Sequence, residues 1–134
     1  MDIEQIRPEL TWRLRQRVLY PAQKLYEMEM DEDNYGVHFG AFNDNELVAV
    51  VSLFQKGTDF QFRKFAVDEG MQGKGVGRAL LNHLQQFAIS EGAGRIWCNA
   101  RLSAVGFYQK FGYSQTGNFF SKNGHDYEIM EKMI

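Results

Sequence analysis

The stretch VDEGMQGKGVGRALLNHLQQFA, residues 67–88, places three glycines in alternation immediately before a strongly helical run. Gly73, Gly75 and Gly77 are each separated by one residue. A glycine inside a helix costs roughly 0.5–1 kcal/mol relative to alanine, so three of them at a helix start need a reason. The pattern indicates that the backbone of this loop approaches another group closely, where a Cβ atom would intrude.

Three kinds of phosphate-binding loop can be compared with this stretch. A Walker A loop requires Ser or Thr after Gly-Lys, but Gly75 follows Lys74. A dinucleotide fingerprint requires a glycine at the sixth place from Gly73, where the chain has Arg78, and it requires a βαβ unit. The third kind is a general anion nest, in which glycine N–H groups and the positive end of the helix dipole hold an anion, with Lys74 and Arg78 at its rim. A ligand-free glycine-rich connection is the weaker alternative.

The elements around this loop follow from hydrophobic alternation and turn signals. The expected strands are 1–6, 35–43, 46–55, 60–67, 94–100, 113–120 and 125–134. Turn residues in 43–45 and 121–124 predict hairpins at those places. The order indicates the α/β class, with a mixed, mostly antiparallel sheet of six to seven strands and helices on both faces, in α-β-α layers.

Helices are expected over 8–21, from the glycine loop to residue 91, and over 103–112, and 22–34 is expected to be a short helix passing into a loop. Leu10, Leu14 and Val18 form one apolar stripe of the first helix. Ser103 is the expected N-cap of the helix over 103–112, and Gly112 lies just past its end.

Length and composition restrict the class of protein. The 134 residues, 44% of them hydrophobic, predict a single domain over 1–134. A formal net charge of −2 gives nucleic-acid binding no support, and the absence of an 18-residue apolar run predicts no membrane span. The single Cys98 excludes an intrachain disulfide and is consistent with a cytoplasmic protein. His83 and His125 lack metal-ligand spacing, so no metal is expected.

Two motifs in order resemble those of the GNAT superfamily of N-acetyltransferases. The pattern Gln72-x-x-Gly75-x-Gly77, between a strand and a helix, is similar to the acyl-CoA loop of that family. The stretch SAVGFYQKFGY, residues 103–113, is similar to its second signature. The residues that match this second signature are Ala104, Phe107, Tyr108, Lys110, Gly112 and Tyr113. The spacing between the motifs and the element order over 1–134 match as well, which predicts a GNAT-like domain.

The resemblance implies acetyl-CoA as a co-substrate. Its pyrophosphate would be held by the N–H groups of the loop and its pantetheine arm by the backbone of the preceding strand. The residues that the resemblance assigns to acetyl-CoA are Phe65, Ala66, Val67, Gln72, Gly73, Lys74, Gly75, Val76, Gly77 and Arg78. The implied reaction is direct transfer of the acetyl group, in a ternary complex, to the amine of a small molecule or peptide. The alternatives are a non-catalytic acyl-CoA sensor on the same fold, or an interaction module that binds another phosphorylated ligand.

The resemblance also implies that Tyr108 is the general acid that meets the departing sulfur, although a tyrosine packed in the core is the alternative. Many members carry Asn where this chain has Arg101, so Arg101 is expected to face the acceptor or the phosphates instead. Strand alternation predicts that Arg63 and Lys64 lie on opposite faces. Arg63 and Arg101 are candidate ligands of an acceptor carboxylate, and a salt bridge of Arg63 to an acidic residue is equally supported.

No residue stands out as the general base. The candidates are Glu27, Glu29, Asp31, Glu32 and His38. A solvated acidic surface and a structural histidine are the simpler interpretations of these residues. The aromatic stretch 118–120 and the last strand could either form a homodimer surface or pack in the core.

Overall fold

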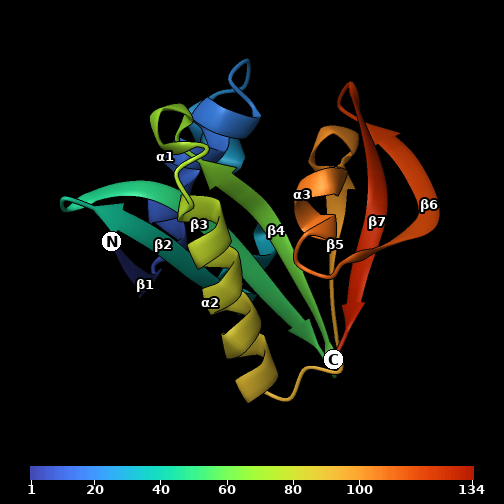
Figure 1. The fold of residues 1–134 in the computed structure, drawn as a ribbon. Coiled ribbons are helices and arrows are strands. Elements are labelled where there is room, and N and C mark those ends of the chain that lie inside the picture. Colours follow the sequence, from blue (N-terminus) through green and yellow to red (C-terminus); the bar gives the residue numbers. More distant parts are fainter. The chain divides into compact units, whose positions relative to one another are not determined.

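The computed structural model describes residues 1–134, and Figure 1 shows its ribbon. Seven strands form a sheet in the order β1-β2-β3-β4-β5-β7-β6, in which β4 and β5 are parallel and the other described ladders antiparallel. The strands are β1 Asp2–Ile6, β2 Val37–Asn43, β3 Glu46–Lys56, β4 Asp59–Val67, β5 Arg95–Arg101, β6 Ser114–Lys122 and β7 His125–Met133. The predicted α/β class and mixed sheet are confirmed.

The helical segments are mostly short. The α-helices are α1 Trp12–Leu14, α2 Val76–Ser90 and α3 Val105–Gln109. The 3₁₀ turns are η1 Pro8–Thr11, η3 Leu25–Met28, η4 Asp31–Tyr35, η5 Glu69–Met71 and η6 Leu102–Ala104, and η2 Arg15–Leu19 is a π turn. None of these helices combines the length and the apolar character that crossing a membrane requires.

The chain divides into two compact units. The first contains Met1–Phe54 and Phe62–Phe87, and the second contains Gln55–Gln61 and Ala88–Ile134. Strand β4 and helix α2 each contribute residues to both units. The single domain expected over 1–134 stays a prediction.

The sheet of the first unit is set by the hairpin of β2 and β3. Phe39 is opposite Val51 and His38 is opposite Ser52, so each pair shares one face of the sheet. Asp44 and Asn45 join the two strands with φ values of 51° and 66°. Two successive positive φ values are the signature of a type I′ turn, whose twist matches that of the strands. The hairpin predicted at this place is confirmed.

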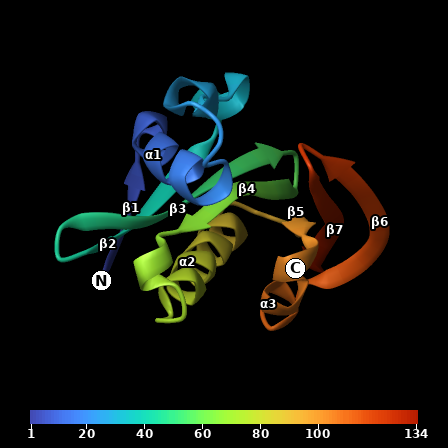
Figure 2. The ribbon, with the colours of Figure 1, turned by 90° about the horizontal axis from the view of Figure 1, so that it is seen from above.

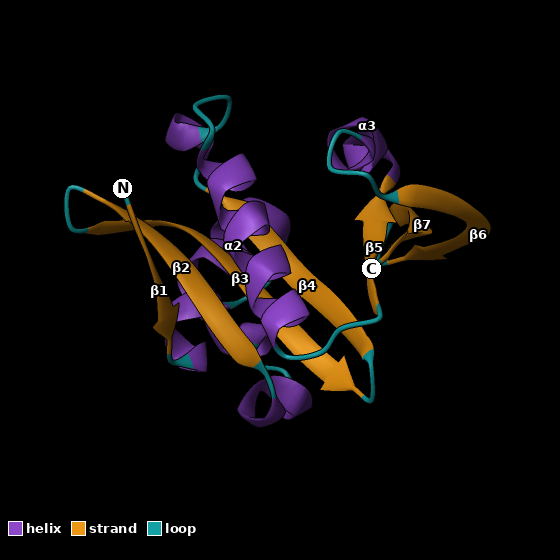
Figure 3. Cartoon of the chain, turned by 60° about the horizontal axis from the view of Figure 1, so that its bottom comes forward, coloured by secondary structure: helices purple, strands orange, loops and turns teal.

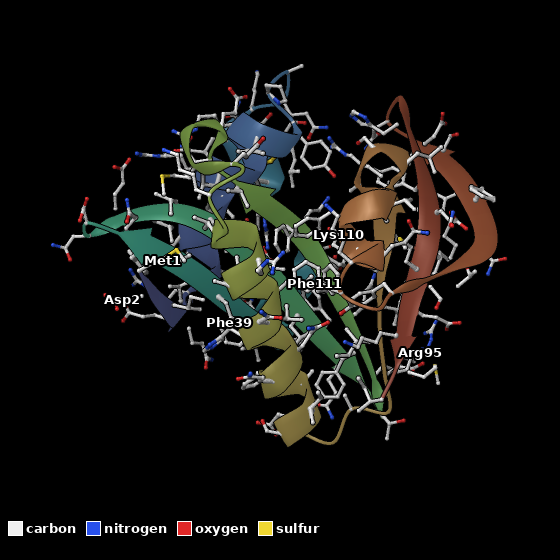
Figure 4. All side chains as sticks on the ribbon, in the orientation of Figure 1. Met1, Asp2, Phe39, Arg95, Lys110 and Phe111 are labelled. Carbon is white, nitrogen blue, oxygen red and sulfur yellow. The ribbon has the colours of Figure 1, made fainter.

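Helical segments cover both faces of the first unit's sheet, as Figures 2 and 3 show. On one face lies Phe39, which is labelled in Figure 4. Its ring is edge-on to His83 and Phe87 of α2, at centroid distances of 5.1 and 5.2 Å. On the other face Leu14 packs with Val50 and Ala66. The predicted placement of helices on both faces is therefore confirmed for this unit.

The single helix expected over 8–21 is instead three consecutive turns of different width, η1, α1 and η2. The Tyr20 N–H lies 3.2 Å from the Arg15 carbonyl oxygen and 3.1 Å from that of Gln16, which widens the last turn. Changes of width rotate successive residues by different angles and break a stripe of period 3.6. Leu14 is buried as expected, but Leu10 is 42% exposed.

The second unit is built on β5. Its first residues form a short parallel ladder with β4, from Asp59 opposite Arg95 to Gln61 opposite Trp97. Its other edge pairs with β7 in an antiparallel ladder, and β7 pairs in turn with β6. The predicted hairpin between β6 and β7 is confirmed, with Asn123 and Gly124 at φ values of 54° and 78°.

Helix α3 begins differently from the prediction and ends as predicted. The expectation that Ser103 is its N-cap is wrong, because η6 starts directly after β5 and places Ser103 inside a 3₁₀ turn. The expected end is confirmed. Gly112 has a φ of 87°, and the Tyr113 N–H reaches back to the Tyr108 carbonyl oxygen at 3.2 Å.

Gly92, which ends α2, provides a test of local backbone strain. Its φ is 91°, a Cβ atom added to it would meet no atom within 4 Å, and the Ala93 N–H bonds the Ala88 carbonyl oxygen at 3.0 Å. Because only the left-handed backbone opposes a side chain here, Gly92→Ala is expected to lower the free energy of unfolding by about 1–2 kcal/mol. Urea unfolding measures the change. Gly70→Ala is the matched control, because Gly70 has equal space without the positive φ, and equal losses in both variants would contradict the explanation.

Candidate functional site

The glycine loop leaves β4 at Val67 and enters α2 at Val76. Gly73 and Gly75 have φ values of 77° and 83°, a conformation that other residues adopt at a cost. A Cβ atom added to either glycine would meet no atom within 4 Å, and both residues are exposed. The glycines are therefore needed for the path of the backbone, and the space beside them is open to a ligand.

Hydrogen bonds fix the first half of the loop to β4. The Gln72 side-chain amide donates to the Val67 carbonyl oxygen at 3.0 Å, and the Met71 N–H donates to the Asp68 carbonyl oxygen at 2.8 Å. The Asp68 N–H donates to the Val48 carbonyl oxygen of β3, and Arg17 pairs with the Asp68 carboxylate, both at 2.8 Å. The loop is thus held at its base while the glycines remain exposed.

The start of α2 has the properties of an anion site. Its first internal hydrogen bond runs from the Ala79 N–H to the Gly75 carbonyl oxygen at 3.1 Å. A helix leaves its first N–H groups without a helical acceptor, and its dipole is positive at this end. The side chain of Val76 is buried and anchors the helix, whereas Lys74 is exposed beside it. These features fit a phosphate group, as the resemblance implies for the CoA pyrophosphate.

Strand β4, which precedes the loop, is irregular at Lys64. This residue has a φ of 57°, a strained conformation of a kind that costs of order 1–3 kcal/mol outside glycine. Arg63 contacts Glu32 of η4, while the Lys64 ammonium donates to the Tyr20 hydroxyl at 2.6 Å. The prediction that Arg63 and Lys64 lie on opposite faces is therefore wrong. The irregular residue interrupts the alternation, so both side chains reach the segment that links β1 to β2.

Arg63 forms a salt bridge with Glu32, with a distance of 2.6 Å between the nitrogen and the oxygen. The guanidinium also lies 6.0 Å from the centroid of the Phe54 ring. The contact with Glu32 corresponds to the salt-bridge interpretation of Arg63. Arg101 ends β5 in the second unit and is half-buried. Its role toward an acceptor stays a prediction.

A buried polar network in the first unit is the feature that sequence reasoning missed. Arg15 and Asp33 are 1% and 3% exposed, and they form a two-pronged ion pair at 2.9 and 3.0 Å. The same guanidinium donates to the Met28 carbonyl oxygen at 3.0 Å and to the Ser52 hydroxyl at 2.8 Å. Burial alone would raise the pKa of Asp33, but the hydrogen bonds from Arg15 and the Met30 N–H outweigh it and hold the pKa below its usual value.

His38 belongs to this network. Its Nδ1 lies 2.7 Å from the Ser52 hydroxyl, and its Nε2 lies 2.8 Å from the Asp33 carbonyl oxygen. Ser52 accepts a hydrogen bond from Arg15, so its own proton is directed to Nδ1, which leaves the ring neutral with its proton on Nε2. Burial lowers the pKa of His38, and the Arg15 charge adds to this effect. With 2% exposure, His38 is a structural residue and has no access to an amine in solution.

The other candidate bases in 27–32 differ in their contacts. Glu27 accepts a hydrogen bond from the Lys24 N–H at 3.0 Å, and Glu32 is the partner of Arg63. Glu29 and Asp31 are exposed. None of these contacts singles out one residue as a base.

Tyr108 lies on α3 in the second unit and is buried. Its ring is edge-on to Phe107 and Tyr113, at centroid distances of 5.3 and 6.1 Å. Burial raises the pKa of Tyr108, and the neighbouring Cys98 and Tyr113 raise it further, so the hydroxyl keeps its proton at neutral pH. Burial also raises the pKa of Cys98 to about 12, so this thiol is not a nucleophile at neutral pH.

Comparison with known proteins identifies the family. The family model described as "Acetyltransferase (GNAT) domain" matches residues 7–134. The chain belongs to the GNAT acetyltransferase family. The predicted resemblance is thereby confirmed, and the protein is an acyl-CoA-dependent acetyltransferase.

Individual GNAT relatives agree with this assignment. The chain is 28% identical to the uncharacterized N-acetyltransferase YitI of Bacillus subtilis (strain 168), over 92% of this chain and 89% of that one. The fold is similar to that of an IAA acetyltransferase from Bacillus cereus ATCC 14579, with a TM-score of 0.82, 20% identity and 99% of each chain covered. It is also similar to an aminoglycoside 6'-N-acetyltransferase complexed with coenzyme A, with a TM-score of 0.76, 17% identity and coverage of 99% and 97%. The name of the first relative gives no acceptor and those of the two solved structures differ, so they assign none to this GNAT protein.

Because burial lowers the pKa of His38, we expect the protein to lose stability in acid. This pKa is lowered in the folded protein from a usual value of 6.5, so the unfolded chain takes up the proton first and acid favours unfolding. The free energy of unfolding is expected to fall as the pH drops below about 6.5, with a slope from this residue approaching about 1.4 kcal/mol per pH unit. Urea unfolding between about pH 7 and pH 5 measures it. His38→Gln is expected to lack this part of the slope, and identical pH profiles of the two proteins would contradict the assignment.

Proposed function

We propose that this GNAT protein transfers an acetyl group from acetyl-CoA to the amine of a small molecule or peptide by direct attack. The observation that carries the proposal is the exposed loop with left-handed Gly73 and Gly75 at the start of α2. In this proposal the loop and the helix N-terminus bind the pyrophosphate, and the backbone of Phe65, Ala66 and Val67 binds the pantetheine arm. Holding both reactants together removes association entropy, worth up to ~7–11 kcal/mol in well-oriented systems.

The thioester oxygen gains negative charge as the amine attacks, so a preorganised N–H donor is required. We assign this role to a backbone N–H near the end of β4, around Val67. The amine loses its proton to water or to a carboxylate. Because Glu32 is bound to Arg63 and His38 is buried, neither is assigned as the base.

Tyr108 is assigned to the departing sulfur of CoA. A free tyrosine has a pKa of about 10 and a thiol about 8.5, so complete proton transfer is uphill by roughly 2 kcal/mol. Burial raises the pKa of Tyr108 and makes complete transfer less favourable still. The hydroxyl therefore acts mainly by donating a hydrogen bond to the sulfur as negative charge develops on it.

The first experiment measures free-thiol release from acetyl-CoA with purified protein and a panel of amines that includes amino acids, polyamines, aminoglycosides and short peptides. Turnover with an amine supports the enzyme. Tight acetyl-CoA binding in calorimetry without turnover would favour an acyl-CoA sensor. No binding of CoA would overturn both.

Gly75→Val tests the loop. A side chain here forces a strained φ and fills the space that the proposal gives to phosphate, so we expect KM for acetyl-CoA to rise at least ~10-fold while KM for the amine changes little. Gly57→Val is the matched control. Gly57 also has a positive φ, 61°, and open space within 4 Å of an added Cβ atom, but it lies between β3 and β4. Equal effects on both KM values, or equal effects of the two variants, would mean that the loop is only structural.

Tyr108→Phe tests the proton donor. The variant keeps the ring and removes the hydrogen bond to the sulfur, so kcat is expected to fall ~10²-fold while the Kd of CoA hardly changes. Tyr113→Phe is the control, because Tyr113 is a second buried tyrosine of the same unit. An unchanged kcat in Tyr108→Phe would remove Tyr108 from the mechanism.

A further inference from the structure

Glu128 of β7 is a buried carboxylate that faces an irregular part of β6. The side chain is 1% exposed. The register of β6 against β7 shifts between Gln115 and Phe119, so the residues between them leave the regular ladder. Gly117, in this interval, has a φ of 81°.

The carboxylate takes the place of the interrupted ladder. One of its oxygens accepts a hydrogen bond from the Gln115 side-chain amide at 2.8 Å, and the other accepts one from the Gly117 N–H at 3.0 Å. Both of these donors are neutral. A buried carboxyl group has lost its contact with water, so these two hydrogen bonds fix where its oxygens lie.

The hydrogen bonds continue from Glu128 to the helix that carries Tyr108. The side-chain amide of Gln109 donates to the side-chain oxygen of Gln115 at 3.0 Å, and Gln109 directly follows Tyr108 on α3. Tyr113, whose ring is edge-on to Tyr108, directly precedes β6. Two contacts therefore join α3 to this part of the chain: the hydrogen bond from Gln109 to Gln115 and the ring contact of Tyr108 with Tyr113. Both lie close in the chain to the irregular part of β6 that is bonded to Glu128.

We propose that Glu128 is a positioning residue for acetyl transfer: through Gln115 and Gln109 it fixes α3 and so the orientation of Tyr108. This inference rests on the proposed function, in which Tyr108 donates to the departing sulfur. Glu128 itself contacts no reacting atom in this account. Its effect is to limit the freedom of α3, a helix of only five residues that has no side-chain cap at its start.

The side-chain amides of Gln109 and Gln115 make Glu128→Gln a conservative variant. In Glu128→Gln, the new amide can donate to the Gln115 oxygen, and Gln115 can then turn over and donate to Gln109. The Gly117 N–H keeps an oxygen acceptor at position 128. All three hydrogen bonds survive, those between side chains with their direction reversed, so this variant is expected to keep kcat within ~2-fold. Glu128→Ala removes the acceptors for two donors and is expected to lower kcat ~10-fold while the Kd of CoA and KM for acetyl-CoA stay unchanged.

Asp126→Ala is the matched control. Asp126 is on the same strand and also accepts a side-chain hydrogen bond, from Ser121, at the end of the hairpin. We expect its kcat to equal that of the wild type. Urea unfolding of each variant shows whether it is folded under assay conditions. If Glu128→Ala does not fold, Gln109→Leu replaces it, because this change removes only the exposed bond of the chain, and it is expected to lower kcat ~3-fold.

A double-mutant cycle separates this inference from the proposed function. If Glu128 acts by orienting Tyr108, then Glu128→Ala costs nothing further in the Tyr108→Phe background. An unchanged kcat in Tyr108→Phe alone would overturn the proposed proton donor, and the inference with it. Suppose instead that Tyr108→Phe does lower kcat. Then any one of three results would overturn only the inference: no loss of kcat in Glu128→Ala, an additive loss in the double variant, or a loss in Glu128→Gln equal to that in Glu128→Ala.

Discussion

The ion pair between Arg15 and Asp33 joins a segment with little regular helix to the sheet of the first unit. The two residues come from two short turns, and the same guanidinium reaches Ser52 of β3 and the Met28 carbonyl oxygen. Removing one member of a buried pair typically costs about 3–5 kcal/mol, a large part of the roughly 5–15 kcal/mol that stabilises a domain. This buried charge pair is therefore a main attachment of the segment, beside the packing of Leu14 and the exposed contacts of Arg17 and Glu32.

The contacts of β4 depend on the same attachment. Arg63 and Lys64 reach Glu32 and Tyr20 only because these residues are held against the sheet, and Lys64 keeps a strained backbone while it makes its contact. Strain of this kind persists where the surrounding structure holds it, and it occurs often at functional sites. Here it lies within β4, three residues before Val67, where the glycine loop begins. The proposed binding of acetyl-CoA thus uses a strand whose irregular backbone is fixed by the segment on its face.

Local signals explain what could be predicted of the fold and the site. The hairpin at Asp44 and Asn45 and the helix end at Gly112 were predictable because each depends on a few neighbouring residues and one backbone conformation. The loop was predictable for the same reason. The start of α3 was not predictable, and the N-cap expected at Ser103 was wrong, because the length of the preceding strand decides where the next turn starts. The buried Arg15 was not predictable either, since an arginine among exposed arginines in the sequence gives no sign of a partner eighteen residues away.

The sequence by itself determined the family, the strand order along the chain and the loop with its glycines, because alternation, turn residues and short motifs are local properties. Only the tertiary structure decided that Arg63 pairs with Glu32, that His38 is a neutral buried residue and that Glu128 supports the irregular part of β6. Each of these depends on which side chains meet when distant segments pack. The charge of a residue can be read from the sequence, but the partner that compensates it is chosen by the fold.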